Sequence, residues 1–419
     1  MIRRFAKPGM WIGPVALAVA LSFAIKALLA WRTYGTNDVL TWEDDLEQIR
    51  QIGAIALYRT GVHLHGSHLI YMPFNHPPFM TNVLRFWGWL SEVSQLPLRF
   101  WMRLSCAVAD VVSAVLLMNI MQHSQPGFRV GMALMMILAP ASLLISGFHG
   151  NTDPIMMMFL VLCVYFMEVH YIPWWAGIAF GMAMSVKIVP LIFIFAILLF
   201  LNGARDRLQF LGAAVVVFIL GSIPIIIQAP ALVMSSVFGY KSLFGYWGFS
   251  LIATGMRDGP AHWLFELYSA AGRPVLFVVI AAASIYMNTA SVRMAPIRQL
   301  ALISFLFLAL TPGFGNQYLV WLIPWTVMLD MPTALAFHVT SGFFLFTSYN
   351  YAAGGYPWYL ADSTRIPPGG MQLLAGIPCW LTVCYIALVW LTGVSVEPSV
   401  HTGRPNATGL SEPDGLTLP

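Results

Sequence analysis

Long apolar segments alternate with short polar ones along almost the whole chain. A helix needs about 20 apolar residues to cross the hydrocarbon core of a bilayer. The pattern therefore predicts about twelve membrane spans, several of them short, as broken helices around a cavity often are. We expect the spans at 11–31, 100–121, 130–146, 154–169, 174–185, 188–201, 208–227, 274–288, 300–311, 318–329, 334–347 and 373–394.

The long loop after the first span has its own periodic pattern. Leu46, Ile49 and Gly53 fall near one stripe of 42–57, with acidic residues and Arg50 elsewhere. This pattern predicts a helix lying in the membrane interface, and 80–90 has a similar character. The predicted fold class is an all-α, polytopic transmembrane bundle. It forms one domain over 1–397, followed by a Gly/Pro/Thr-rich tail, 398–419, that we expect to be disordered.

Composition supports a membrane protein. The chain is 59% hydrophobic and 9% charged, whereas about a quarter of a soluble domain is charged. Its net charge of +4 is spread without a basic run, which excludes a nucleic-acid-binding domain. All four cysteines fall inside apolar runs, where cysteine behaves as a small hydrophobe.

Basic residues predict the orientation in the membrane. They precede the first span, which we interpret as a retained helix, and occupy two short connections: Arg3, Arg4, Lys7, Arg205, Arg207, Arg293 and Arg298. The positive-inside rule places these groups, and both chain ends, in the cytoplasm. The other face then receives the polar connections, at 34–99, 147–153, the Lys187 turn, 228–273, 312–317 and 349–370.

Acidic residues follow the first span directly. A carboxylate just outside the bilayer can deprotonate a hydroxyl acceptor if it is within reach. Asp38, Asp44 and Asp45 are the candidates. The alternative is structural, with Asp38 as a helix cap and Asp44 and Asp45 on a solvated helix face.

Other polar groups belong to the same predicted face. In Asn75-His76-Pro77-Pro78 the prolines would hold His76 in rigid backbone, or the segment is simply a turn. His149, Asn151 and Asp153 could bind a sugar or phosphate, or cap the helix that follows. Lys187 could bind a phosphate, or extend to the interface.

Two further loops carry candidate ligand groups. Lys241 and Arg257 lie among aromatic residues that could stack on a sugar or form an interfacial belt. Asn316 and Gln317 follow a Gly-rich turn that attracts anions or joins two helices. We expect Arg103 and Asp110 to pair with other groups inside the bundle, in a structural role. His63, His65 and His68 cluster in the first loop, but a hydrated loop explains them better than a metal site, so no residue is assigned as a metal ligand. Whether the protein needs a divalent metal stays open.

The order of these motifs resembles the membrane-embedded C-type glycosyltransferases. Three elements carry the resemblance: Asn37-Asp38 with Trp42, the stretch 147–153, and Thr311-Pro-Gly-Phe-Gly-Asn316-Gln317-Tyr318-Leu-Val-Trp321-Leu-Ile-Pro324. Asn75-His76-Pro-Pro is similar to a further element of that family. The second element is similar to a motif of dolichol-linked glucosyltransferases, and the third to one of bacterial polyprenol-phosphate mannosyltransferases. The resemblance covers about 11–394.

The resemblance implies a polyprenyl-phosphate sugar as donor and a lipid-linked or envelope glycan hydroxyl as acceptor, in the lipid bilayer. Mannose is favoured by its frequency in the family, and no cofactor is implied with certainty. Asp38 matches the position of the family's base. It lacks the adjacent acid of some relatives, and Asp44-Asp45 supplies such a pair further along, so the assignment of the base stays open among the three.

Three functions remain open at this point. The favoured one is an inverting hexosyltransferase acting on the non-cytoplasmic face, by default of a bacterial inner membrane. A transporter or lipid flippase would show charged groups at helix midplanes and two matched halves. A non-catalytic scaffold subunit would explain the spans but not the convergence of polar residues on one face.

Overall fold

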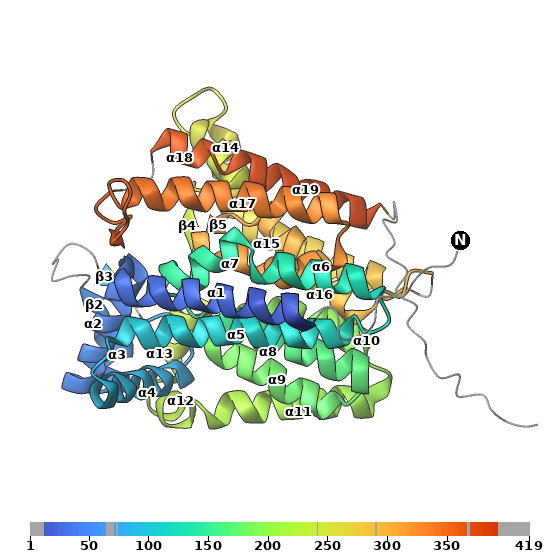
Figure 1. The fold of residues 1–419 in the computed structure, drawn as a ribbon, viewed down its shortest axis with the longest axis horizontal. Coiled ribbons are helices and arrows are strands. Elements are labelled where there is room, and N and C mark those ends of the chain that lie inside the picture. Colours follow the sequence, from blue (N-terminus) through green and yellow to red (C-terminus); the bar gives the residue numbers. More distant parts are fainter. Residues whose placement is uncertain are drawn as a thin grey trace, which may run out of the picture.

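The chain forms a bundle of helices that lie side by side (Figure 1). The computed structural model describes residues 12–63, 71–72, 74–240, 242–289, 291–366 and 369–392. It is 78% helical, which confirms the all-α prediction. The strands among the described residues are pairs of two-residue segments: β1 (Gly35–Thr36) with β6 (Leu360–Ala361), β2 (Val62–His63) with β3 (Tyr71–Met72), and β4 (Leu243–Phe244) with β5 (Gly313–Phe314).

The helices follow the apolar pattern, with several breaks. Those of the first half are α1 (Ile12–Arg32), α2 (Asn37–Ile52), α3 (Ala54–Thr60), α4 (Phe79–Ser94), α5 (Leu98–Ile120), α6 (Pro126–Ile137), α7 (Pro140–Leu144), the π-helix η3 (Ile145–His149), α8 (Asp153–Tyr165), η4 (Phe166–His170), α9 (Pro173–Val186), η5 (Val189–Phe193) and α10 (Ile194–Phe200). Those of the second half are α11 (Gly203–Leu220), α12 (Ile223–Gln228), α13 (Pro230–Val233), η6 (Met234–Phe238), α14 (Gly248–Gly255), α15 (His262–Met287), α16 (Pro296–Leu310), the 3₁₀ helices η7 (Asn316–Trp321) and η8 (Ile323–Met328), α17 (Met331–Ala352), α18 (Gly370–Leu374) and α19 (Ile377–Leu391).

Six helical segments of the described chain are long and apolar enough to cross a membrane. They are Gly13–Arg32, Leu98–Ile120, Pro126–His149, Asp153–His170, His262–Met287 and Gly370–Leu391, and two shorter apolar helices are Val189–Phe200 and Pro296–Leu310. The predicted count of about twelve spans is not confirmed. The length and apolar composition of these segments support an integral membrane protein.

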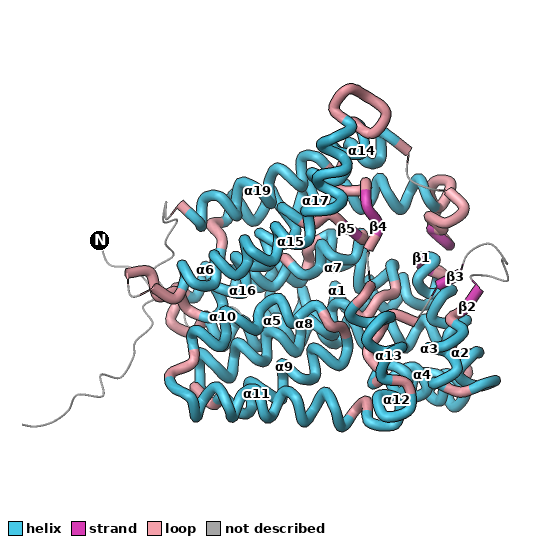
Figure 2. The backbone as a smooth tube through the Cα atoms, turned by 180° about the vertical axis from the view of Figure 1, so that it is seen from behind, coloured by secondary structure: helices cyan, strands magenta, loops and turns pink. Residues whose placement is uncertain are grey.

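The long first loop folds at one end of the bundle, which we call the loop end. There α2, α3 and α4 gather beside α12 and α13 (Figures 1 and 2). The interfacial helix predicted to begin at Trp42 begins earlier, at Asn37, and ends at Gly53, whose φ is +86°. Thr36 caps it, because its hydroxyl accepts from the Asp38 amide at 3.4 Å. Asp38 is therefore in the first turn and is not the cap.

The second half differs from the apolar pattern at two places. The predicted span 274–288 is part of a longer helix, α15, which begins at His262 and keeps Pro274 in its interior. The predicted span 318–329 is not an α-helix but the successive 3₁₀ helices η7 and η8. Pro324 removes a backbone donor there, and irregular backbone is tolerated at membrane depth only where protein covers it. Both helices are almost fully buried.

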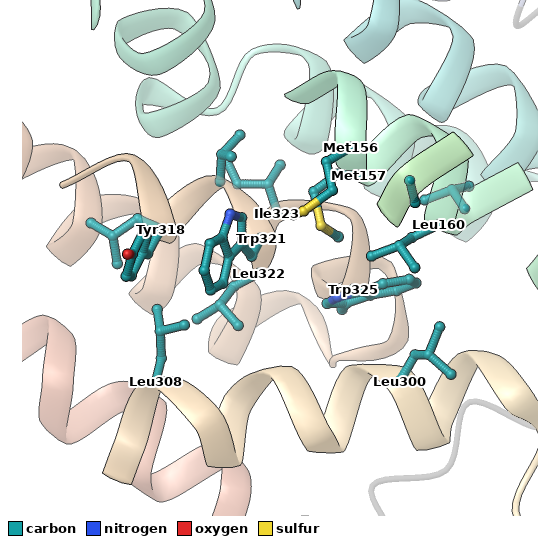
Figure 3. Packing of buried hydrophobic residues seen from close by; sticks show 14 of the residues in the cluster. Met156, Met157, Leu160, Leu300, Leu308, Tyr318, Trp321, Leu322, Ile323 and Trp325 are labelled. Atoms are coloured by element: carbon teal, nitrogen blue, oxygen red, sulfur yellow. The ribbon is translucent and has the colours of Figure 1, made fainter. Parts of the chain in front are cut away.

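Figure 3 shows how η7 and η8 are covered. Trp321 and Trp325 lie between two α-helices, with Met156, Met157 and Leu160 of α8 on one side and Leu300 and Leu308 of α16 on the other. All seven side chains are at most 3% exposed. This packing fixes the start of α8 relative to η7, and both segments carry predicted site residues.

A buried lysine and a buried aspartate pair with each other inside the bundle. The Lys26 ammonium of α1 donates to Asp110 of α5 at 2.6 Å and to Ser142 of α7 at 2.8 Å. Ser142 donates to the same carboxylate oxygen at 2.9 Å. The predicted pairing of Asp110 within the bundle is confirmed, and it ties three helices together. Lys26 was not singled out in the sequence, although a lysine within an apolar helix is conspicuous.

We expect Asp110→Leu to destabilise the folded chain by about 3–5 kcal/mol, because it leaves the buried Lys26 ammonium uncompensated. The double variant Lys26→Met/Asp110→Leu should recover most of that loss, since two apolar groups of similar volume need no partner. Thermal unfolding of the purified protein in detergent measures both. Losses that simply add in the double variant would contradict the pairing.

Candidate functional site

The Asp38 carboxylate is the centre of a hydrogen-bonded group at the loop end. One of its oxygens, Oδ2, accepts from Asn151 Nδ2 at 2.7 Å and lies 3.1 Å from His149 Nε2. On the other side of the imidazole, His149 Nδ1 lies 2.8 Å from the Tyr349 hydroxyl. The Asp38 side chain keeps 27% of its surface exposed, while that of His149 keeps 7%. Contacts with His149 and Asn151 therefore orient the carboxylate, and part of the Asp38 side chain stays exposed.

Backbone contacts bring α2 against the turn that carries His149. The Thr36 hydroxyl donates to the His149 carbonyl at 2.7 Å, so the cap of α2 also anchors the end of η3. Gly150 has a φ of +82°, and a Cβ there would lie 2.2 Å from Val39 Cγ2. Only glycine permits this backbone and this close approach. The sequence His149-Gly150-Asn151 thus directs both polar side chains to one carboxylate.

The Arg103 side chain stabilises the same turn, the one that carries His149, by hydrogen bonds to backbone carbonyls. Its guanidinium is fully buried and donates to the Ala30 and Thr33 carbonyls at 2.8 Å each. It also donates to the Phe148 carbonyl at 3.2 Å. These are backbone acceptors at the end of α1 and in η3, which would otherwise be buried without donors. The interior role predicted for Arg103 is found, although its partners are carbonyls and not a carboxylate.

Lys187 extends the group toward α8 and η7. Its ammonium donates to Asp153 Oδ2 at 2.7 Å and lies 3.4 Å from Asn151 Oδ1 and 5.7 Å from the centre of the Tyr318 ring. Trp321 Nε1 donates to the other oxygen of Asp153. Asp153 is fully buried and both its oxygens are occupied, whereas 14% of the Lys187 side chain is exposed. Asp153 therefore orients Lys187, and Lys187 is the member that can meet a ligand.

Asp153 also begins α8, directly before Pro154, as the motif predicts. The preceding Thr152 occupies the cap position but makes no side-chain capping bond.

His76 lies beside the same group. Its ring packs against Trp42, with centroids 4.4 Å apart and the planes tilted by 41°, and hydrogen-bonds the Val186 backbone, next to Lys187. Burial, followed by the neighbouring Lys187 charge, lowers the pKa of His76 to about 3. The ring is thus neutral at physiological pH, and its Nδ1 is buried without a partner among the described residues. The Tyr58 hydroxyl donates to the His76 carbonyl and fixes the segment before α4.

The three candidate acids have different surroundings. Burial alone would raise the pKa of Asp38, but His149, Asn151 and Lys187 outweigh it and hold the pKa below its ordinary value. Burial, then the charge of Asp44, raises the pKa of Asp45 to about 8. Asp45 is 4% exposed, and its Oδ1 has no hydrogen-bond partner in the described structure. Asp38 is the ionised acid that contacts His149.

The remaining predicted residues lie outside this hydrogen-bonded group. Asn316 and Gln317 are half-buried at the start of η7, close in sequence to Tyr318. The Arg257 guanidinium lies 5.7 Å from the centre of the Phe265 ring, in the exposed loop between α14 and α15. Lys241, His65 and His68 lie outside the described residues. In the described part of the chain, no three His, Cys, Asp or Glu side chains are grouped so that they could hold a metal.

Sequence reasoning missed the aromatic members of the site. Tyr349, Trp321 and Tyr318 contact His149, Asp153 and Lys187 respectively. Tyr240, whose backbone carbonyl accepts from Arg273 Nη2 at 2.8 Å, has its pKa raised by burial and then by the nearby Asp38 charge. In a chain with 15 tyrosines and 15 tryptophans, composition alone could not single these out.

Comparison with known protein families identifies the class of protein that carries this site: the chain is a membrane glycosyltransferase. The chain is similar to a particular family, described as Mannosyltransferase (PIG-M), a mannosyltransferase family of the C-type superfamily, whose model matches residues 145–347. The matched segment is just under half of the chain and contains His149, Asn151, Asp153 and Lys187. The search of curated proteins gives no match. The family confirms the resemblance and favours an enzyme over a transporter or scaffold.

We expect Tyr349→Phe to lower the turnover number about threefold to tenfold with little change in KM, because a hydrogen bond that orients His149 contributes about 1 kcal/mol. Mannosyl transfer by membranes containing the variant measures this. Tyr351→Phe is the matched control, since Tyr351 is an exposed tyrosine on the same helix. Equal effects of the two substitutions would contradict a role for the Tyr349 hydroxyl.

Proposed function

We propose that this enzyme transfers mannose from a polyprenyl-phosphate donor to a hydroxyl of a lipid-linked or envelope acceptor on the non-cytoplasmic face. Asp38 accepts the proton of the acceptor hydroxyl while its oxygen attacks the anomeric carbon. The bond from that carbon to the phosphate oxygen breaks, and polyprenyl phosphate leaves as an anion. Attack opposite to the leaving group inverts the anomeric configuration.

The contact between Asp38, His149 and Asn151 is the observation that carries this proposal. A general base must be ionised, oriented and within reach of the proton that it takes. Asp38 has a lowered pKa, two side-chain partners and an exposed side. His149, held by Tyr349, stabilises the protonated and ionised forms in turn, because its imidazole can donate to or accept from Asp38. Asp45 has neither the exposure nor these contacts.

Lys187, on the other side of Asn151, is our candidate for binding the phosphate of the donor. An ammonium has three donors, and the Asp153 carboxylate and the Asn151 amide receive two of them. The neutral His76 ring beside it adds an uncharged polar group. Asp38 and Asp153 nevertheless leave this group with one net negative charge, so the donor phosphate needs a further cation. Lys241 is the sequence neighbour of Tyr240, which is close to both acids, and remains our candidate.

The non-cytoplasmic orientation follows from charge. The basic connections with Arg205, Arg207, Arg293 and Arg298 are predicted inside. The described ends of α10, α15 and α1 that face those connections lie opposite the loop end (Figure 1). The site at the loop end then faces outward, where a lipid-linked donor enters from the bilayer between helices.

We expect Asp38→Asn to lower the turnover number by a factor of about 100 to 10,000, the range that general-base catalysis contributes. Asp44→Asn and Asp45→Asn are the controls, expected to retain transfer within about tenfold, since neither acid contacts His149. Transfer of labelled mannose from a polyprenyl-phosphate donor in membranes measures all three. Full activity of Asp38→Asn would overturn the base assignment.

The pH dependence separates Asp38 from Asp45. The depressed pKa of Asp38 means that the basic form is present above that pKa and is lost as the pH falls through it. We expect kcat/KM to be flat between about pH 5.5 and 7.5, well above the ordinary range of aspartate. If Asp45 were the base, kcat/KM would instead rise about tenfold per pH unit up to its pKa of about 8. Initial rates across this range decide between the two.

A further inference from the structure

A cavity of about 310 Å³ opens at the loop end where three helix junctions meet. Its walls are one stripe of α4, the break between α2 and α3, and the break between α11 and α12. The lining residues are Ile52, Gly53, Ala54, Ile55, Pro78, Thr81, Asn82, Arg85, Gly221, Ser222, Pro224 and Ile225. None of them belongs to the Asp38 and Lys187 group, and 310 Å³ is within the range of small-molecule sites.

The junctions hold the cavity open. Pro78, the N-cap of α4, is followed by Thr81, Asn82 and Arg85 at three, four and seven residues, so the four lie along one face of the helix. Gly221 allows α11 to approach α4 closely, because a Cβ there would lie 2.9 Å from Phe79. Figures 1 and 2 both place α12 beside α4. The cavity is therefore a product of packed elements and does not depend on a single loop.

The charge of the lining is positive. Among the described lining residues, Arg85 is the one ionised side chain and none is Asp or Glu. The nearby acid on α4, Glu92, pairs with Arg50 instead. Arg85 has no ion pair or hydrogen bond within the described chain, although its guanidinium carries donors in a fork that matches phosphate. An exposed arginine without an ion pair, in a cavity whose described lining has no acid, favours an anionic ligand.

Two polar side chains near Arg85 can add hydrogen bonds. Asn82 is exposed on the same turn of α4. Ser222 occupies the cap position of α12, yet its hydroxyl makes no capping bond and has no partner in the described structure. A serine in that position normally accepts from the helix. Because the Ser222 hydroxyl holds no bond, it can rotate toward a ligand without breaking one.

The outer surface of α4 indicates where the cavity lies in the membrane. Phe86, Trp89 and Val93 are more than half exposed, and the Phe86 and Trp89 rings stack at 5.8 Å. Aromatic and aliphatic side chains on an amphipathic helix favour the interface between headgroups and acyl chains. Ile52, Ile55, Pro224 and Ile225 give the cavity apolar walls at the same level. The cavity thus offers a cation to a headgroup and apolar surface to the chain that follows it.

We propose that this cavity binds the phosphate of a membrane phospholipid, at a site separate from the reaction centre. Arg85 receives the phosphate oxygens and Asn82 and Ser222 donate to them, while the apolar walls contact the first part of the acyl chains. The site does not depend on the mannosyltransferase mechanism, since it shares no residue with it. A bound lipid would brace α3 and α4 against α12, next to the segment that carries His76.

The test is native mass spectrometry of the full chain in detergent, titrated with dioctanoyl phosphatidylglycerol. We expect one lipid to bind, with affinity about tenfold weaker in Arg85→Gln and about threefold weaker in Ser222→Ala, because the guanidinium contributes its charge as well as its hydrogen bonds whereas the hydroxyl contributes one hydrogen bond. Arg32→Gln is the matched control: Arg32 is exposed at the same end of the bundle, loses the same charge and does not line the cavity. Since Arg85 and Arg32 are both exposed, thermal unfolding should be unchanged in both variants.

Two further ligands separate the sources of a phosphate. Dioctanoyl glycerol, which has no phosphate, should not bind. Inorganic phosphate should displace the lipid only at concentrations at least about a hundredfold above that of the lipid, because it lacks the apolar contacts. Equal lipid binding by Arg85→Gln and wild type overturns the site. Binding of inorganic phosphate as tight as that of the lipid overturns the assignment to a phospholipid.

Discussion

The buried guanidinium of Arg103 is the contact on which the site depends. A charge without an acidic partner inside a helical bundle is expensive, and it is tolerated here because backbone carbonyls surround it. Those carbonyls belong to the end of α1 and to η3, the segments directly before Asp38 and His149. The arginine therefore satisfies two helix ends and sets their separation. The Asp38 contact to His149 is a consequence of that separation.

The site is assembled from segments that are remote in sequence. Asp38 and Tyr349 lie outside the part that matches the family model, while His149, Asn151 and Lys187 lie within it. The matched part supplies the orienting and cationic groups, and the first loop supplies the acid. Under the proposed mechanism, such a division would let the first loop vary with the acceptor while the matched part keeps the donor side.

The electrostatic design of the site is unusual for the phosphate-releasing reaction that we propose. Asp153 takes up much of the Lys187 charge, and it is held by Trp321 in a fully buried position. This pairing keeps Lys187 in place before substrate binds, which avoids reorganisation during the reaction. The same pairing reduces the attraction for phosphate. The ion pair with Asp153 thus favours a fixed orientation of Lys187 over a strong attraction between Lys187 and phosphate.

The polar residues of the site could be predicted from the sequence more accurately than the geometry of the membrane segments could. Asp38, His149 and Lys187 could be found because polar groups between apolar runs are conspicuous. Tyr349 could not be found, because nothing distinguishes it from interfacial tyrosines until its hydroxyl is placed beside His149. The segment 318–329 was mistaken for a span because hydropathy cannot tell a buried pair of 3₁₀ helices from an apolar α-helix.

The short parallel pairing of β1 with β6 has a consequence for biosynthesis. Gly35 and Thr36, just before Asp38, pair with Leu360 and Ala361, so the first loop is completed by nearly the last described segment of the chain. Chains are made and inserted from the N-terminus, so most helices are in the bilayer before that partner exists. Asp38 is thus synthesised well before Leu360 and Ala361, which pair with the strand next to it. The pairing beside the start of α2 can therefore form only after residues 360–361 have been made.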